Sequence, residues 1–184
     1  MRVTGGKYRG RRIICPPGVI RPAMDRMRES LFSILGNLEG ASFLDLFSGS
    51  GLVGIEAASR GAVPVHLVEM DRGKKPTIER NLQMVSTEHR LFMMRVEKFI
   101  RLAKRRYTVV YADPPFPMPG KQQLTAAIGS AGLVEQGGLF IIHHPAEEQW
   151  DDVIGEFSCT DTRTYGRSVL RFFAYTSPGA EDGL

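Results

Sequence analysis

A glycine-rich stretch preceded by an acid is the first pattern in the chain that could do chemistry. Residues 43–54 have the sequence Phe-Leu-Asp-Leu-Phe-Ser-Gly-Ser-Gly-Leu-Val-Gly, in which Asp45 stands in an apolar run ahead of the glycines. This order predicts a strand, a tight turn and a helix, because glycine lets the backbone turn sharply and approach a ligand closely. Glu69 follows 20 residues after Gly49, where an acid that binds ribose hydroxyls is expected. The pattern therefore predicts a nucleotide-type cofactor site.

The charge of Asp45 favours one class of cofactor. A carboxylate just before the turn would repel a pyrophosphate and attract a cation. S-adenosylmethionine carries a sulfonium and an ammonium and no phosphate, so it suits a site that contains both Asp45 and Glu69. An NAD-dependent oxidoreductase is disfavoured for the same reason. The alternative for Asp45 is a buried carboxylate whose oxygens accept hydrogen bonds from loop N–H groups.

A second candidate site follows another apolar run. Residues 113–116 are Asp-Pro-Pro-Phe, and the two prolines hold the backbone extended after the predicted strand at 107–112. The Asp113 carboxylate and the Pro114 carbonyl would then offer two acceptors to a planar amine, and Phe116 would offer a flat surface for a base. This turn predicts methyl transfer to an exocyclic amine of a nucleobase. The alternative is a rigid turn with a core phenylalanine.

The positive charge of the chain is concentrated at its N-terminus. Residues 1–28 hold eight Lys/Arg and one acid, whereas the other 156 residues hold sixteen Lys/Arg and nineteen acids. Such a basic segment suits a polyanion, and a solvated arm that only improves solubility is the alternative. Tyr8 could stack on a base or pack the segment onto the sheet. The candidate phosphate contacts are Lys7, Arg9, Arg11, Arg12, Arg21, Arg26 and Arg28.

Alternating strand and helix patterns predict an α/β fold with a mostly parallel sheet that is covered by helices on both faces. An antiparallel C-terminal hairpin is expected to bring the sheet to seven strands, and a short N-terminal β-hairpin and a helix to precede it. We expect residues 1–40 to form the basic extension, 41–176 the catalytic domain and 177–184 a disordered tail. The strands are expected at 43–47, 65–68, 91–94, 107–112, 138–143, 156–164 and 168–176, and the helices of the sheet domain at 52–60, 75–85, 97–105 and 121–131.

The composition is that of a globular protein of one domain. The chain has 184 residues, of which 42% are hydrophobic and 24% charged. No apolar run approaches the roughly 18 residues of a membrane span, and no signal peptide opens the sequence. Cys15 and Cys159 match no metal spacing. We therefore expect a cytoplasmic monomer with reduced cysteines, no metal and no membrane contact.

Together these motifs resemble those of the Rossmann-like class I methyltransferases that modify exocyclic amines of nucleobases. More narrowly, the chain is similar to the bacterial RsmD family, which methylates the guanine N2 amine in 16S ribosomal RNA. The similarity covers most of the chain, including residues 2–12, 21–32 and 165–172. It implies Asp113, Pro114 and Phe116 as the catalytic residues. It also implies S-adenosylmethionine as the cofactor, bound by Asp45, Phe47, Ser48, Gly49, Gly51, Glu69, Met70, Val96, Glu97 and Asp113.

The chain departs from the RsmD pattern at three places. Ala23 and Met24 stand where the family usually has a threonine, and Val96 with Glu97 where it tends to have an aspartate. His143 and His144 follow the fifth predicted strand, where the family often has a glutamate. Two histidines could indicate a metal or a base. Because no third ligand is evident, we expect them to fill a loop near the site.

The motif at 113–116 does not choose the base, since adenine, cytosine and guanine enzymes share it. An adenine-N6 DNA methyltransferase of minimal size therefore stays open, as does a non-catalytic RNA-binding protein on the same fold. The sheet domain leaves no room for the large target-recognition domain that DNA methyltransferases often carry. This favours a partner that presents its own shape, namely 16S ribosomal RNA or the 30S subunit.

Overall fold

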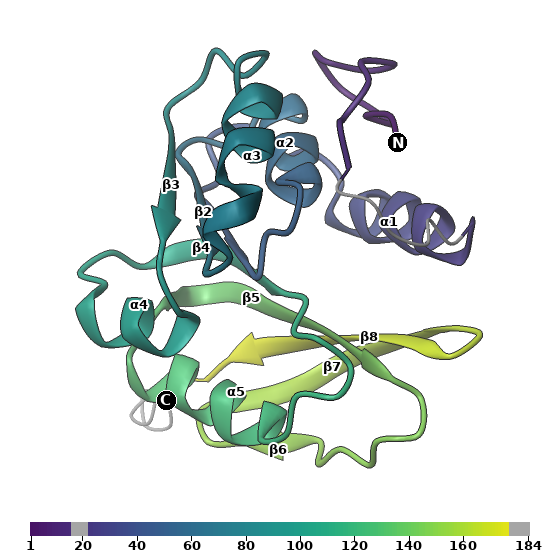
Figure 1. Cartoon of the computed structure of the whole chain (residues 1–184). Helices are drawn as coiled ribbons and strands as arrows, with labels where there is room; N and C mark the ends of the chain where they lie inside the picture. The colour runs from purple at the N-terminus through teal and green to yellow at the C-terminus, as the bar shows by residue number, and fades with distance from the viewer. Residues whose placement is uncertain (16–21, 177–184) are drawn as a thin grey trace.

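An eight-stranded sheet forms the centre of the computed structural model, which describes residues 1–15 and 22–176 (Figure 1). The strand order is β3-β2-β1-β4-β5-β8-β7-β6. Strands β1 to β5 run parallel, and β8, β7 and β6 are added antiparallel at one edge. The strands are β1 (Phe43–Leu46), β2 (Val65–Glu69), β3 (His89–Met93), β4 (Tyr107–Ala112), β5 (Val134–Pro145), β6 (Val153–Ile154), β7 (Phe157–Tyr165) and β8 (Ser168–Tyr175).

Helices cover both faces of the sheet (Figure 1). Successive strand residues point to opposite faces, so Phe43 joins the core beneath α1, α2 and α3, whereas Leu44 joins the core beneath α4 and α5. The N-terminal segment belongs to the first of these cores through Val3, Tyr8 and Ile13. The helices are α1 (Pro22–Leu35), α2 (Leu52–Ser59), α3 (Lys75–Leu82), preceded by a 3₁₀ turn at Arg72–Lys74, α4 (Val96–Leu102) and α5 (Lys121–Ser130).

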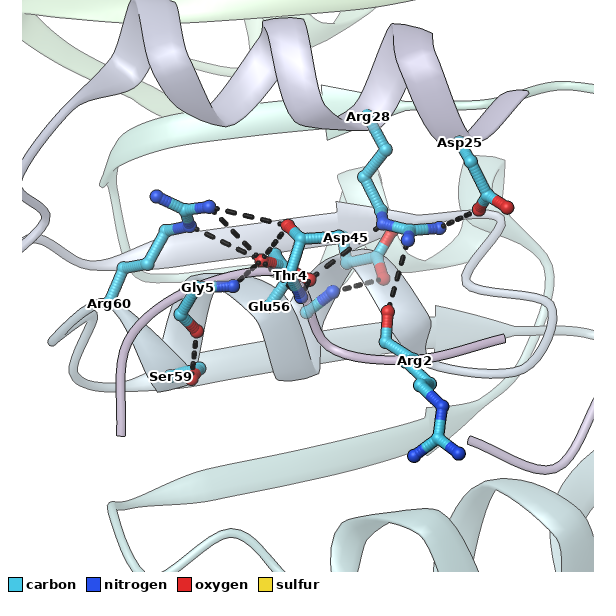
Figure 2. A network of polar contacts seen from close by, with 10 residues as sticks. Arg2, Thr4, Gly5, Asp25, Arg28, Asp45, Glu56, Ser59 and Arg60 are labelled. Carbon is cyan, nitrogen blue, oxygen red and sulfur yellow. Dashed lines mark hydrogen bonds and ion pairs between the residues drawn. The ribbon is translucent and has the colours of Figure 1, made fainter. Parts of the chain in front are cut away.

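A buried glutamate in α2 holds the N-terminal segment against the sheet domain (Figure 2). The carboxylate of Glu56 accepts hydrogen bonds from the backbone N–H of Thr4 at 2.9 Å, the hydroxyl of Thr4 at 2.6 Å and the N–H of Gly5 at 2.9 Å. It also forms ion pairs with Arg60 at 3.2 Å and with Arg28 at 3.7 Å. Because the charge of Glu56 is balanced and its oxygens are bonded, it can be buried at little cost.

Close backbone contact continues this docking beyond Glu56. The Lys7 N–H donates to the Ser59 carbonyl at 2.7 Å, and the Tyr8 N–H donates to the Ser59 hydroxyl at 2.8 Å. Gly6 between them has φ of 73°, and a Cβ there would lie 1.8 Å from the Ser59 carbonyl oxygen. Glycine is therefore required at position 6 both by the backbone conformation and by the distance to α2.

The predicted α/β architecture is confirmed, with one more strand than expected. The two-residue strand β6 pairs with β7 and extends the antiparallel edge. In the N-terminal segment the expected hairpin is reduced to one antiparallel bridge between Arg2 and Arg12. The predicted tail at 177–184 lies outside the described residues. Across the described part of the chain, no helix is long and apolar enough to cross a membrane.

Candidate active site

Four neighbouring strands bring one residue each to the same edge of the sheet. Leu46 of β1 lies beside Val68 of β2 and beside Ala112 of β4, and Ala112 lies beside Ile142 of β5. Ligands of open α/β sheets bind at the carboxyl ends of the strands. The residues that follow these four in the sequence are Phe47, Glu69, Asp113 and His143, and all of them line one cavity of about 1080 Å³.

The glycine-rich turn forms one wall of this cavity. Phe47 follows β1, has φ of 62° and is the only non-glycine residue with positive φ in residues 1–15 and 22–176. Such a conformation is unfavourable for a side chain with a Cβ and is concentrated at functional sites. It turns the chain so that Gly49 also lines the cavity, and the Gly49 N–H donates to Glu69 at 2.9 Å.

The second wall contains Glu69, which is anchored by the backbone on both sides. One of its oxygens accepts from Gly49, and the other accepts from the Asp71 N–H at 2.9 Å. Lys74 lies 3.5 Å from the carboxylate and also lines the cavity. The carboxylate is thus held in place, and each oxygen keeps a lone pair free to accept a further hydrogen bond.

Asp45 is not among the residues that line the cavity, and its contact with a cofactor stays a prediction. Strand alternation points its side chain into the face covered by α2, where it is almost fully buried and accepts a hydrogen bond from the Gly54 N–H at 3.0 Å. Burial, followed by the charges of Asp113 and Glu69, raises its pKa to about 8. The alternative of a buried carboxylate bonded to loop N–H groups describes this residue.

Ser48 and Gly51 also lie behind the cavity wall. The Ser48 hydroxyl donates to the Asp45 carbonyl at 2.7 Å and accepts from the Val68 N–H at 3.1 Å, so it joins the turn to β2. A Cβ at Gly51 would lie 3.2 Å from the Leu67 side chain, which shows that this glycine permits close packing. Both residues shape the turn, and their contacts with a cofactor stay predictions.

The Asp-Pro-Pro-Phe turn forms the third wall, and a histidine lies beneath it. The Nδ1 of His143 is 2.7 Å from Oδ1 of Asp113. The rings of His143 and Phe116 meet edge to face, with centroids 5.0 Å apart. A carboxylate can only accept, so the Nδ1 of His143 donates to Asp113. The imidazole of His143 therefore contacts both Asp113 and Phe116, the two side chains that the sequence predicts to meet a base.

A buried lysine holds the rest of this turn. Lys121, at the start of α5, is 4% exposed and donates to the carbonyls of Phe116 and Met118 at 2.8 and 2.9 Å. Its charge is paired with Glu148. Proline-rich residues 114–119 offer few backbone donors of their own, so Lys121 fixes the loop through its acceptors.

The remaining predicted cofactor residues line the cavity. Met70, Val96 and Glu97 all do so, with Val96 buried and Met70 exposed. Lys74 and Arg95 also line the cavity, although the sequence alone did not indicate them as site residues. His143 was expected only to fill a loop. The signal that could have found it was its place near the carboxyl end of β5, one residue after Ile142, which pairs with Ala112 of β4.

The basic N-terminal residues divide into exposed and buried ones. Arg28 differs from the expectation of an exposed phosphate contact. It is 5% exposed, and its guanidinium binds Asp25 at 2.9 Å and the Arg2 carbonyl at 3.1 Å (Figure 2). Tyr8 is also buried, with its hydroxyl 3.1 Å from that of Ser86, so it packs the segment and cannot stack on a base. Arg21 lies outside the described residues. The exposed basic residues among those predicted are Lys7, Arg9, Arg11, Arg12 and Arg26.

The fold and the site together define a Rossmann-like class I methyltransferase. The defining features are the parallel sheet of this order, its antiparallel edge, and the Asp-Pro-Pro-Phe turn beside the glycine-rich turn. Residues 1–174 match the family model described as "Conserved hypothetical protein 95", and the chain belongs to this family, which is the RsmD family.

Individual relatives agree with this assignment. The chain is 31% identical to "Putative rRNA methyltransferase YlbH" of Bacillus subtilis, over 94% of this chain and 98% of the relative. It is 29% identical to "Ribosomal RNA small subunit methyltransferase D" of Escherichia coli strain K12, over 99% and 93%. Among solved structures, "Putative methyltransferase yhhF from Escherichia coli" superposes with a TM-score of 0.84 at 27% identity, covering 96% and 98%.

Proposed function

We propose that this protein uses S-adenosylmethionine to methylate the exocyclic N2 amine of a guanine in 16S ribosomal RNA. One observation carries the proposal. Asp113, Pro114 and Phe116 of the turn line the same cavity as Glu69 and Gly49. A site for an amine-bearing base therefore adjoins a site for a ribose-bearing cofactor. The names of the curated relatives supply the class of RNA.

The cavity residues fit S-adenosylmethionine. Glu69 would accept hydrogen bonds from the ribose hydroxyls, because its bonded oxygens retain lone pairs. Met70 and Val96 would provide apolar contacts for the adenine, and Glu97 a carboxylate near its amine. Glu69 and Glu97 together supply negative charge for a cationic ligand. When bound, the cofactor supplies an electrophilic methyl group on a sulfonium.

Asp113 and Pro114 would act on the amine of the base. Its lone pair is delocalised into the ring, so the amine is a poor nucleophile. Hydrogen bonds from its N–H groups to the Asp113 carboxylate and the Pro114 carbonyl would orient it, and the carboxylate would offset the positive charge that develops on nitrogen. The proton would leave afterwards to Asp113 or to water.

His143 would keep Asp113 ready for this role. Its Nδ1–H occupies Oδ1 of Asp113, which leaves Oδ2 for the amine. The imidazole is 3% exposed and lies against Phe116. A buried partner of this kind restricts the rotation of the carboxylate, and precise positioning of reacting groups lowers the barrier.

The N-terminal segment would bind the RNA backbone. Glu56 and Ser59 hold this segment on α2, and its basic side chains are exposed to solvent. Asn81 bonds both to Ile14 and to the Ser50 carbonyl of the glycine-rich turn, so the segment leads toward the cavity edge. Phosphate contacts from this segment would recruit the RNA beside the site of chemistry.

Transfer of a tritiated methyl group tests the proposal. The purified protein is incubated with S-adenosylmethionine and, separately, 30S particles, naked 16S ribosomal RNA and double-stranded DNA. We expect incorporation into an RNA sample, and digestion to nucleosides should place the label in N2-methylguanosine. Label in N6-methyladenosine of DNA would support the minimal DNA methyltransferase instead. Failure to label either RNA sample would refute the proposed function.

A further inference from the structure

The nearly neutral remainder of the chain contains a second basic segment. Between residues 90 and 106 stand seven Lys/Arg and a single acid, Glu97. The surrounding sequence is rich in acids, and this hides the segment in any count of the whole chain. The seven basic residues are Arg90, Arg95, Lys98, Arg101, Lys104, Arg105 and Arg106.

All seven side chains are exposed on the surface. Within residues 1–15 and 22–176, none of them lies within 4.0 Å of a carboxylate oxygen. Some exposed cations elsewhere are paired, namely Lys75 with Glu79, Arg163 with Asp161 and Arg167 with Glu147. A charged face that served only solubility would be expected to mix both signs. Here the positive charges are concentrated without local compensation.

The cluster begins at the active-site cavity and leads away from it. Arg95 lines the cavity and precedes the first residue of α4. Lys98 and Arg101 follow at intervals of three residues, which places them along one side of the helix. The opposite side packs into the core through Phe99 and Ile100. Lys104, Arg105 and Arg106 then continue to Tyr107, at the amino end of β4.

This surface and the N-terminal segment lie on opposite faces of the sheet (Figure 1). The N-terminal segment packs with α2, whereas α4 packs on the other face, and both approach the carboxyl edge that carries the cavity. A polyanion that crossed this edge would meet cations on both sides of the reacting base.

We propose that the α4 surface, defined as Arg90, Arg95, Lys98, Arg101 and residues 104–106, is a second contact surface for the phosphate backbone of the RNA. This inference rests on the proposed function for the identity of the RNA. The strand would cross the cavity between the two surfaces, so that the target base enters while its flanking phosphates are held on either side. Such contacts position the RNA and do not read its sequence.

A charge-matched pair of variants tests the α4 surface. The first carries Lys98→Gln, Arg101→Gln and Arg105→Gln, which leaves the cavity residue Arg95 intact. The control carries Lys75→Gln, Arg80→Gln and Arg163→Gln, three exposed cations outside both basic surfaces. Binding of naked 16S ribosomal RNA is measured for both and for the wild type between 50 and 200 mM salt. The affinity for S-adenosylmethionine, measured by calorimetry, reports whether each variant retains its cavity.

The slope of log K against log salt is negative, and each lost phosphate contact reduces its magnitude by roughly 0.7 to 0.9. We therefore expect the α4 variant to lose about 2 from the slope and on the order of tenfold in RNA affinity at low salt, with unchanged cofactor affinity. The control should keep the wild-type slope. Equal slopes for the two variants would overturn the inference. If the wild type binds RNA but does not methylate it, the proposed function is refuted. The comparison of slopes would still show whether the α4 surface contacts RNA phosphates.

Discussion

Nδ1 of His143 lies 2.7 Å from Oδ1 of Asp113, and the register of two parallel strands creates this pair. Ala112 of β4 lies beside Ile142 of β5, so the residues that follow them meet at the carboxyl edge. The imidazole also contacts Phe116, and its Nε2 is buried without a hydrogen-bond partner among the described residues. The contact of His143 with Asp113 is therefore made through Nδ1.

Replacing His143 should separate its positioning role from a simple packing role. His143→Leu fills the space but cannot donate to Asp113, and we expect kcat to fall on the order of 10²-fold. His143→Asn places an amide N–H near the position of Nδ1 and should restore most of the loss. The KM for S-adenosylmethionine should stay near the wild-type value in both. Steady-state kinetics with both substrates varied measures each quantity.

His144 provides the matched control for these variants. It is as buried as His143, but its Nδ1 bonds to the Pro145 carbonyl at 2.8 Å and its ring stacks on Trp150. His144→Asn should therefore lower the thermal midpoint without a selective loss of kcat. Equal kcat values for His143→Leu and His143→Asn, in proteins of equal thermal stability, would contradict the positioning role.

Asp113→Ala should strongly lower kcat and preserve cofactor binding. The carboxylate is the one charged acceptor in the turn at 113–116, and loss of a preorganised electrostatic contact costs on the order of 10² to 10³ in kcat. Glu69 and Gly49 are unaffected, so calorimetry should give an unchanged affinity for S-adenosylmethionine. Single-turnover methyl transfer measures the chemical step. Turnover at the wild-type rate would show that Asp113 has no role in it.

Asp45 should make stability depend on pH. Its pKa is raised to about 8 in the fold, against about 3.9 in an unfolded chain. Between these values the folded state binds more protons, so the free energy of unfolding falls as the pH rises. The fall relative to Asp45→Asn, which cannot ionise, should be about 2 kcal/mol between pH 5.5 and 7. Urea unfolding of both proteins at the two pH values measures it, and parallel curves would contradict a neutral carboxyl.

Gly6→Ala and Gly10→Ala distinguish backbone strain from loss of docking. Both glycines have positive φ, so each substitution should cost about 1 kcal/mol of strain. Only Gly6 would bring its Cβ against α2, at 1.8 Å from the Ser59 carbonyl, whereas Gly10 has no atom within 4 Å. Gly6→Ala should therefore release the N-terminal segment as well.

Hydrogen exchange detects that release. The amides of Lys7 and Tyr8, which donate to Ser59, should lose protection in Gly6→Ala and keep it in Gly10→Ala. RNA affinity should fall with the protection in the first variant. Equal exchange of these amides in the two variants would show that contact with Ser59 does not hold the segment.

Local patterns were sufficient to predict the elements and two of the cavity walls. The alternation of apolar strands and amphipathic helices predicted the parallel sheet, because these periods are properties of short segments. The glycines and the prolines marked the turns for the same reason, since they restrict the backbone wherever they occur. Gly49, Glu69 and the turn at 113–116 accordingly line the cavity.

The roles of charged side chains, and the directions in which they point, were harder to predict from the sequence. Arg28 counted as one of the basic residues of the N-terminus, but it faces inward to Asp25 and Glu56, which are 3 and 28 residues away in the chain. Asp45 stands just before the turn, yet it is buried and its side chain accepts from the Gly54 N–H of α2. In both cases the neighbour that decides the role comes from another element.

The amino-acid sequence by itself determined the class of this protein, because strand and helix periods, turn-forming residues and two acids near turns are all local features. Only the tertiary structure paired Asp113 with His143, buried Arg28 and joined the N-terminal segment to α2 through Glu56. These relationships depend on strand register and on contacts between distant segments. The free energy of such contacts comes from packing and charge pairing across elements, which no single segment encodes.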